Sequence, residues 1–177
     1  MPVERLESSA FRDALARFAS GVTVVTAARP DGLVGFTATG FTSVSLEPPL
    51  ILVCAAKRAS AHDAVVAAPE FGVSILSDRQ RWIAEQFARS GVDRFRGVPL
   101  RIDRVALIEE AVAQLECRRH ALHDAGDHTI VIGEVVATAV GQGRPLVHCA
   151  RRFGAFVAET APHSASAAIA LPSIGEP

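Results

Sequence analysis

The sequence predicts a mainly β protein with a few helices, folded as a closed or nearly closed antiparallel barrel. Short segments rich in β-branched and aromatic residues recur at near-regular spacing, separated by turn residues, which is typical of an all-β barrel. Segments with helical periodicity are few and do not alternate with the strands as βαβ units require. A doubly wound nucleotide-binding fold is therefore not expected.

The amino-terminal part is expected to begin with a helix and continue as strand pairs. Ser8 or Ser9 can cap this helix, and Gly21 is expected to end it. The turn sequence Arg29-Pro30-Asp31-Gly32 separates the first two strands. We expect strands over residues 22–28, 33–38, 41–46 and 50–54.

The remaining chain is expected to alternate less regularly between helix and strand. Helices are predicted over residues 61–67 and 78–89, followed by a polar loop over 91–99. Strands are predicted over residues 71–76, 111–120, 127–140, 146–149 and 153–156. The sequence thus predicts one domain over residues 1–160. Residues 161–177, rich in Ala, Ser and Pro, are expected to form a flexible tail.

Composition restricts the class of protein. Of the 177 residues, 49% are hydrophobic and 21% are charged, and the net charge is −1. Such a balance does not support nucleic-acid binding through a broad basic face. No apolar run approaches the roughly 18 residues of a membrane span, and the amino terminus lacks the apolar core of a signal peptide. Three widely spaced cysteines without a CxxC pair favour reduced thiols in the cytoplasm.

Familiar catalytic and metal-binding motifs are absent. The sequence contains no P-loop and no GxSxG elbow. His120, His123 and His128 have no cysteine or second carboxylate cluster to complete a tetrahedral set, so no metal site is expected.

Residues 35–49, GFTATGFTSVSLEPP, mix hydroxyl and large apolar side chains. An ordinary strand–turn–strand has this composition, because threonine is a good strand former. A segment that turns its backbone and hydroxyls toward a polar, partly aromatic ligand also needs both kinds of side chain. Composition alone leaves both interpretations open.

Four blocks together resemble the short-chain flavin reductases, the reductase components of two-component flavin-dependent monooxygenases. They are GVTVVTA at 21–27, GFTATGFTSVSLEPPLILVC at 35–54, GDHTIVIGEV at 126–135 and PLVHCARRFGAF at 145–156. The resemblance implies an FMN-binding split β-barrel with Greek-key-like antiparallel strands, built as a homodimer. It also implies hydride transfer from NADH or NADPH to FMN or FAD, with the reduced flavin passing to a partner monooxygenase. The cofactors carry this chemistry, so binding residues rather than a catalytic triad are expected.

The resemblance implies three groups of flavin-binding residues. Those along the flavin are Thr37, Ala38, Thr39 and Gly40. Those of the phosphate loop CAAKRAS are Cys54, Ala55, Lys57, Arg58 and Ser60. Arg94 is expected near the flavin phosphate or its adenylate extension. Many relatives have Ser or Asn in place of Gly40, so one possible side-chain hydrogen bond is missing here.

The nicotinamide side is implied by two further blocks. His128 is expected to face the reduced nucleotide, and Arg152, Phe153 and Gly154 match the closing motif that lines the same pocket. Phe153 replaces a common Tyr, which leaves stacking without a phenolic hydrogen bond.

Two other functions remain as alternatives. One is a split-barrel flavoprotein that holds FMN tightly without NAD(P)H-dependent turnover. The other is a non-enzymatic module that binds haem or another tetrapyrrole. The sequence chooses neither between FMN and FAD nor between NADH and NADPH.

Overall fold

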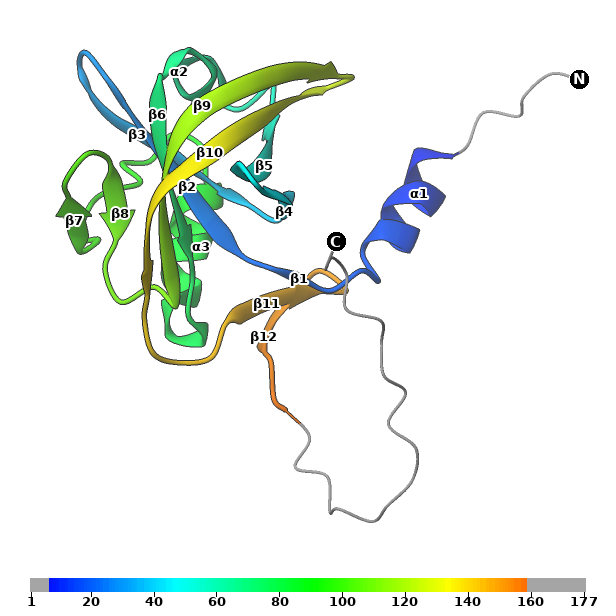
Figure 1. Ribbon diagram of the computed structural model, residues 1–177. Helices are drawn as coiled ribbons and strands as arrows, with labels where there is room; N and C mark the ends of the chain where they lie inside the picture. Colours follow the sequence, from blue (N-terminus) through cyan, green and yellow to red (C-terminus); the bar gives the residue numbers. More distant parts are fainter. Residues whose placement is uncertain (1–6, 159–177) are drawn as a thin grey trace, which may run out of the picture.

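The computed structural model describes residues 7–158 as an antiparallel β structure with short helices (Figure 1). Its main sheet has seven strands in the order β3-β2-β6-β9-β10-β5-β4. These strands are β2 (Thr23–Arg29), β3 (Gly32–Ala38), β4 (Phe41–Leu46), β5 (Pro49–Ala56), β6 (Glu70–Ile75), β9 (Ala113–Ala125) and β10 (His128–Val140). The predicted tail over 161–177 lies outside the described residues, and the domain limits stay a prediction.

All neighbours in the main sheet pair antiparallel, which confirms the predicted fold class. The sheet curls so that β3, at one end, contacts β5, near the other end. Strand β3 leads into β4 through only two residues, Thr39 and Gly40. These two residues, which we call the β3–β4 corner, therefore join the opposite ends of the sheet covalently, as expected of a split barrel.

Two smaller sheets accompany the barrel. Strands β1 (Ser20–Gly21), β11 (Leu146–Cys149) and β12 (Arg152–Ala155) form one, beside helix α1 (Ser8–Leu15). Strands β7 (Leu100–Ile102) and β8 (Ala106–Ile108) form the other. In Figure 1, α1 and the β1-β11-β12 sheet project from the barrel.

Two hydrophobic clusters lie on opposite faces of β2. Val25 belongs to the first cluster, with residues of α2 (His62–Ala67), and Val24 belongs to the second, with residues of α3 (Arg81–Ala88). The sequence TVVTA supports this arrangement, because β-branched residues can be buried on both faces of a strand. Packing of α3 on β2 and β3 brings the end of α3 beside β3.

The structure corrects several expected element bounds. Helix α1 ends at Leu15 rather than near Gly21, because Ser20 and Gly21 instead pair with β11. The helix expected over 78–89 begins as a 3-10 turn, η1 (Asp78–Gln80), with Ser77 in a capping box. Strand β9 runs five residues past 120, and the β7–β8 hairpin was not expected.

Candidate functional site

An open cavity of about 670 Å³ lies where β3, β5, the start of β10 and the end of α3 meet. We call it the main cavity. Eight residues that the family resemblance implies line it: Thr37, Ala38, Thr39, Gly40, Cys54, Arg58, Arg94 and His128. The other lining residues are Phe36, Ala56, Ala59, Phe87, Ala88 and Ser90. The structure thus brings residues far apart in the sequence to one site.

The β3–β4 corner forms one wall of the main cavity. Thr39 and Gly40 are exposed and follow the last paired residue of β3. The Gly40 carbonyl accepts a hydrogen bond of 2.8 Å from the Cys54 amide. A β-carbon at Gly40 would lie 2.9 Å from Cys54 Cβ, so this position has no room for a side chain. A ligand at this wall meets backbone at Gly40 and a hydroxyl at Thr39.

The hydroxyl of Thr37 has a partner within the protein. Its Oγ1 donates a hydrogen bond of 2.6 Å to the carbonyl of Ala84 in α3. The hydroxyl therefore helps to attach α3 to β3, and it keeps only acceptor capacity toward the cavity.

Arg94 is fixed between the barrel and the loop that follows α3. Its Nη1 donates to the Gly35 carbonyl at 2.8 Å, and its Nε donates to the Arg89 carbonyl at 2.9 Å. Partial burial lowers the pKa of Arg94, although an arginine stays cationic in proteins. Its remaining N–H groups leave it able to donate to an anion.

Gln86 of α3 holds the Arg94 loop in place. Its Nε2 donates to the carbonyls of Arg94 and Arg96 at 2.8 and 3.0 Å. Sequence analysis missed Gln86, because its partners lie eight and ten residues further along the chain. It also missed Ser90, although its position directly before the expected Arg94 loop was an available signal.

The side chains of the expected phosphate loop lie in different surroundings. The Lys57 ammonium forms an ion pair with Asp124 and donates to the Gly126 carbonyl at 2.6 Å. Lys57 therefore fastens this loop to the β9–β10 turn. Arg58 lines the main cavity, Ser60 lines a neighbouring cavity, and Ala55 is buried in the barrel core.

His128 stands at the mouth of the main cavity with its side chain 40% exposed. Its Nδ1 lies 2.7 Å from an Asp127 carboxylate oxygen. This hydrogen bond is the largest cause that lowers the pKa of Asp127, and the Arg58 charge adds to it. An imidazole that donates from Nδ1 to Asp127 keeps Nε2 for a ligand.

The closing motif lies apart from the main cavity in the described chain. Arg152, Phe153 and Gly154 are in β12, and none of them lines that cavity. The ring centroids of Phe153 and His148 lie 5.3 Å apart. The guanidinium of Arg81 lies 5.5 Å from the Phe153 ring centroid. Their expected role in nicotinamide binding stays a prediction.

Two negative findings apply to residues 7–158 only. No group of three or more His, Cys, Asp or Glu side chains there is arranged to hold a metal ion. No helix there is long and apolar enough to cross a membrane.

The main cavity suits an aromatic ligand that carries an anionic group. Phe36 and Ala88 supply apolar surface, the β3–β4 corner supplies backbone and hydroxyl groups, and Arg58 and Arg94 supply two guanidinium groups, whereas the Phe87 ring is fully buried. Guanidinium groups match phosphate geometry well. The fold and site therefore define a split-barrel protein that can hold a phosphorylated aromatic cofactor.

Comparison with known proteins specifies the family. Residues 15–156 match the family model described as flavin reductase like domain. The chain belongs to this family.

Among the similar proteins is FMN reductase (NADH) SmoA of Agrobacterium fabrum, 44% identical over 84% of this chain and 86% of its own length. The reductase component of 4-hydroxyphenylacetate 3-monooxygenase from Thermus thermophilus is 43% identical over 81% of this chain and 93% of its own length. Streptomyces globisporus NADH:FAD oxidoreductase SgcE6, solved with NAD and FAD fragments, has a TM-score of 0.83. It is 37% identical, over 90% of this chain and all of its own. These names include both FMN and FAD.

Proposed function

We propose that the protein is an NAD(P)H:flavin oxidoreductase that reduces FMN or FAD and supplies the reduced flavin to a partner monooxygenase. The observation that carries this proposal is the main cavity, formed by residues of the matched domain and lined by seven of the residues implied for the flavin and by His128, implied for the nicotinamide. The relatives named as FMN reductase (NADH) and as a monooxygenase reductase component support the reaction and the partner.

The nicotinamide and the flavin supply the hydride chemistry when bound, so the chain's own task is to bind and orient them. Arg58 and Arg94 would hold the flavin phosphate through charge-assisted hydrogen bonds. The backbone at Gly40 and the Thr39 hydroxyl would contact the polar edge of the flavin. Lys57 contributes by fixing the loop that presents Arg58.

We assign His128 to the nicotinamide side of the site. Its ring is half-exposed at the cavity mouth, and Asp127 orients it through Nδ1. Nε2 can then hydrogen-bond a carboxamide, or donate to a phosphate when the ring is protonated. His128→Ala should raise the KM for NADH more than the dissociation constant of the flavin. An equal rise in the KM for NADH and in the dissociation constant of the flavin would contradict this assignment.

We further propose that the protein is a homodimer, and that α1 and β4 contribute to the interface. Apolar side chains stand exposed on and near both elements, with Phe18 78% and Leu46 86% exposed. Leu15 and Phe18 line one cavity together with Phe41 of β4, and contiguous apolar surface marks interaction sites. Sedimentation equilibrium should give twice the monomer mass for the wild-type protein. The Phe18→Glu variant should give a lower mass, closer to that of the monomer. A cytoplasmic location stays a prediction.

The activity test mixes the purified protein with NADH or NADPH and with FMN or FAD, and follows the nicotinamide absorbance. Oxidation in at least one of the four combinations is expected, and its absence from all four would contradict the proposal. A matched comparison is Arg58→Ala against Arg79→Ala, because Arg79 lines a different cavity. Arg58→Ala should raise the flavin dissociation constant by about tenfold, since hydrogen bonds to charged groups contribute about 1.5–3 kcal/mol.

A further inference from the structure

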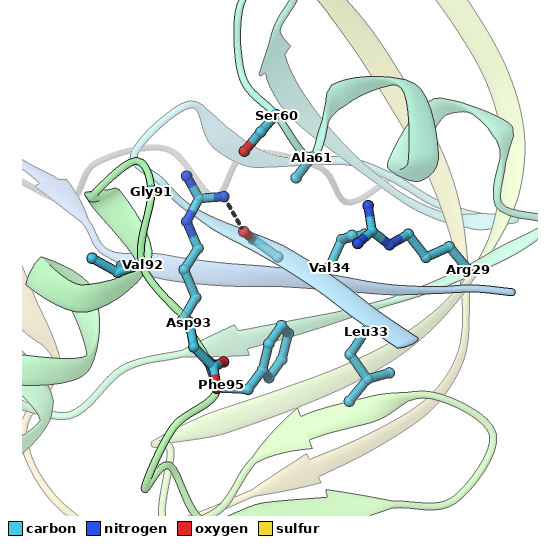
Figure 2. Close-up of a pocket in the computed structure, with 11 residues that line it drawn as sticks. Arg29, Leu33, Val34, Ser60, Ala61, Gly91, Val92, Asp93 and Phe95 are labelled. Atoms are coloured by element: carbon cyan, nitrogen blue, oxygen red, sulfur yellow. Dashed lines mark hydrogen bonds between the residues drawn. The ribbon is translucent and has the colours of Figure 1, made fainter. Parts of the chain in front are cut away.

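The segment over residues 57–61 connects β5 to α2 and borders two cavities. We call it the 57–61 segment. Arg58 and Ala59 line the main cavity, and Ser60 and Ala61 line the neighbouring cavity of about 290 Å³. Figure 2 shows Ser60 and Ala61 beside this second cavity. The position of the 57–61 segment therefore determines where the Arg58 guanidinium lies in the main cavity.

The first end of the 57–61 segment is held by Lys57. The Lys57 amide donates to the Asp127 carbonyl at 2.9 Å, and the Lys57 ammonium pairs with Asp124. These two charged side chains are 41% and 79% exposed, and ion pairs this exposed contribute little. The backbone hydrogen bond therefore provides most of the attachment at this end.

The second end of the segment is held by His62, the first residue of α2. The His62 side chain is only 12% exposed, and both of its ring nitrogens have partners. Nδ1 lies 2.7 Å from an Asp63 carboxylate oxygen, and Nε2 lies 2.9 Å from Thr129 Oγ1. Because an ionised carboxylate only accepts hydrogen bonds, Nδ1 donates to Asp63. In the neutral ring, Nε2 then accepts from the Thr129 hydroxyl.

Thr129 is the neighbour of His128 in β10, but its side chain lies on the other face of the strand. Successive side chains of a β-strand point to opposite faces. His128 lines the main cavity, whereas Thr129 is buried and contacts α2 through His62. The His62 ring therefore joins the strand that carries His128 to the segment that presents Arg58.

We propose that His62 is a positioning residue for hydride transfer, because it fixes the segment that presents Arg58 relative to the strand that carries His128. The inference rests on the proposed function, in which Arg58 holds the flavin phosphate and His128 lies on the nicotinamide side. The rate of such a reaction depends steeply on geometry, and a misplacement of about 1 Å can cost on the order of a hundredfold. Side chains that bind cofactors are held to this precision by hydrogen-bonded groups behind them.

The buried location makes the hydrogen bond between His62 and Thr129 difficult to replace. If His62 is truncated, the Thr129 hydroxyl loses its partner at a position with little access to water, which is unfavourable. The backbone of Thr129 pairs with Ala55 of β5 and Asp124 of β9, and these pairings do not involve His62. Strand β10 should therefore stay in the sheet while the 57–61 segment shifts relative to it.

The experiment compares the wild-type protein with His62→Ala, Thr129→Val and the double variant. Thr129→Val removes the hydroxyl and keeps a branched side chain, so it tests the same hydrogen bond if His62→Ala folds poorly. His62→Gln is the conservative variant, because its amide can still bond the Thr129 hydroxyl. His123→Ala is the matched control, since His123 is an exposed histidine of the adjacent strand β9. Melting temperatures establish that each variant is folded.

Two measurements need no turnover. Hydrogen exchange without any cofactor should become faster over residues 58–61 in His62→Ala and Thr129→Val, and it should stay at the wild-type rate in His123→Ala. The flavin dissociation constant, measured by flavin fluorescence without nicotinamide, should change little in all of these variants, because Arg58 and Arg94 are retained. Unchanged exchange over 58–61 in both variants would overturn the inference.

Turnover separates positioning from binding. His62→Ala should lower kcat about tenfold, since the geometry of hydride transfer is disturbed, while the KM for NADH changes little. The primary isotope effect with NADH deuterated at the nicotinamide C4 should be at least as large as in the wild type. His62→Gln should recover part of the kcat. The double variant should be no slower than His62→Ala, because both substitutions remove the same hydrogen bond.

The inference is overturned if kcat stays at the wild-type value in His62→Ala and Thr129→Val. It is equally overturned if only His62→Ala is slow, or if the isotope effect falls, because a step other than hydride transfer would then be slowed. Failure of the proposed function looks different, since the wild-type protein would then oxidise no NADH or NADPH with either flavin. Hydrogen exchange would still show in that case whether His62 fixes the 57–61 segment.

Discussion

Gly40 packs directly against Cys54 across the seam between β3 and β5. A β-carbon at Gly40 would lie 2.9 Å from Cys54 Cβ and 3.3 Å from Sγ, and the Gly40 carbonyl accepts the Cys54 amide at 2.8 Å. The 2.9 Å contact is shorter than real β-carbons show, and the 3.3 Å contact is tighter than most. Glycine is therefore required here by packing, and this wall of the cavity consists of backbone.

Gly40→Ala should destabilise the protein by about 1–3 kcal/mol, the usual range for overpacking. Urea unfolding measures this free energy. Gly21→Ala is the control, because a β-carbon at Gly21 would meet nothing within 4 Å. Removing the opposing β-carbon with Cys54→Gly should reduce the effect of Gly40→Ala in a double-mutant cycle. Cys54→Ala keeps that β-carbon, so it should leave the destabilisation by Gly40→Ala unchanged. Equal destabilisation by Gly40→Ala in the Cys54→Gly and Cys54→Ala backgrounds would contradict the contact.

Flavin should protect Cys54 from alkylation. Cys54 is half-buried and lines the main cavity, whereas half-buried Cys149 lies beside the carbonyls of Ala16 and Arg17. Burial raises the pKa of Cys117 to about 12, so this thiol should stay unreactive until the protein unfolds. Peptide mass spectrometry with and without FMN measures each site. Protection of Cys149 to the same degree as Cys54 would argue against binding in the main cavity.

Gln86→Ala should loosen the Arg94 loop and weaken flavin binding. The variant loses two hydrogen bonds to loop carbonyls, each contributing about 1 kcal/mol. Hydrogen exchange should become faster over residues 91–96, and the flavin dissociation constant should rise. Gln142→Ala, in the cavity lined by Arg79, is the control. Weaker flavin binding without faster exchange would contradict a role in positioning the loop.

The contact between Asp127 and His128 should depend on pH in a defined direction. The pKa of Asp127 is lowered mainly by its hydrogen bond to His128. Its stabilising contribution is therefore complete above the ordinary aspartate pKa of about 3.9 and is lost as pH falls through the lowered value. His128→Ala should raise the pKa of Asp127, as measured by carboxyl carbon NMR. His123→Ala should not raise it, and an unchanged value in His128→Ala would contradict the contact.

The sequence predicted those parts of the fold that depend on local signals. The turn residues at 29–32 and the prolines at 48 and 49 marked the limits of four strands to within one residue. The β7–β8 hairpin was missed, because its strands are only three residues long, β7 contains Arg101, and Asp103 and Arg104 lie in the turn between them. Strands this short pair only because the surrounding fold presents them to each other.

Eight residues that line the main cavity were predictable from the family resemblance, but the hydrogen bonds within the site were not. The resemblance places Thr37 and Lys57 at the flavin, which stays a prediction, but it does not reveal that Thr37 also bonds Ala84 and that Lys57 also bonds the β9–β10 turn. Both partners lie far away in the sequence, so no local pattern could reveal them. Arg94 and Arg58 have no such competing ion pair in the described chain and keep their expected role as a prediction.

The two-residue β3–β4 corner also restricts the path by which a ligand can leave. This short connection keeps the end of β3 close to the start of β4, and the Gly40–Cys54 hydrogen bond of 2.8 Å extends the β4–β5 pairing up to the corner. The loop that carries Arg94, which also lines the main cavity, is held to α3 through the side chain of Gln86. Exchange of flavin with a partner enzyme should therefore proceed by displacement of this loop, while the barrel itself stays rigid.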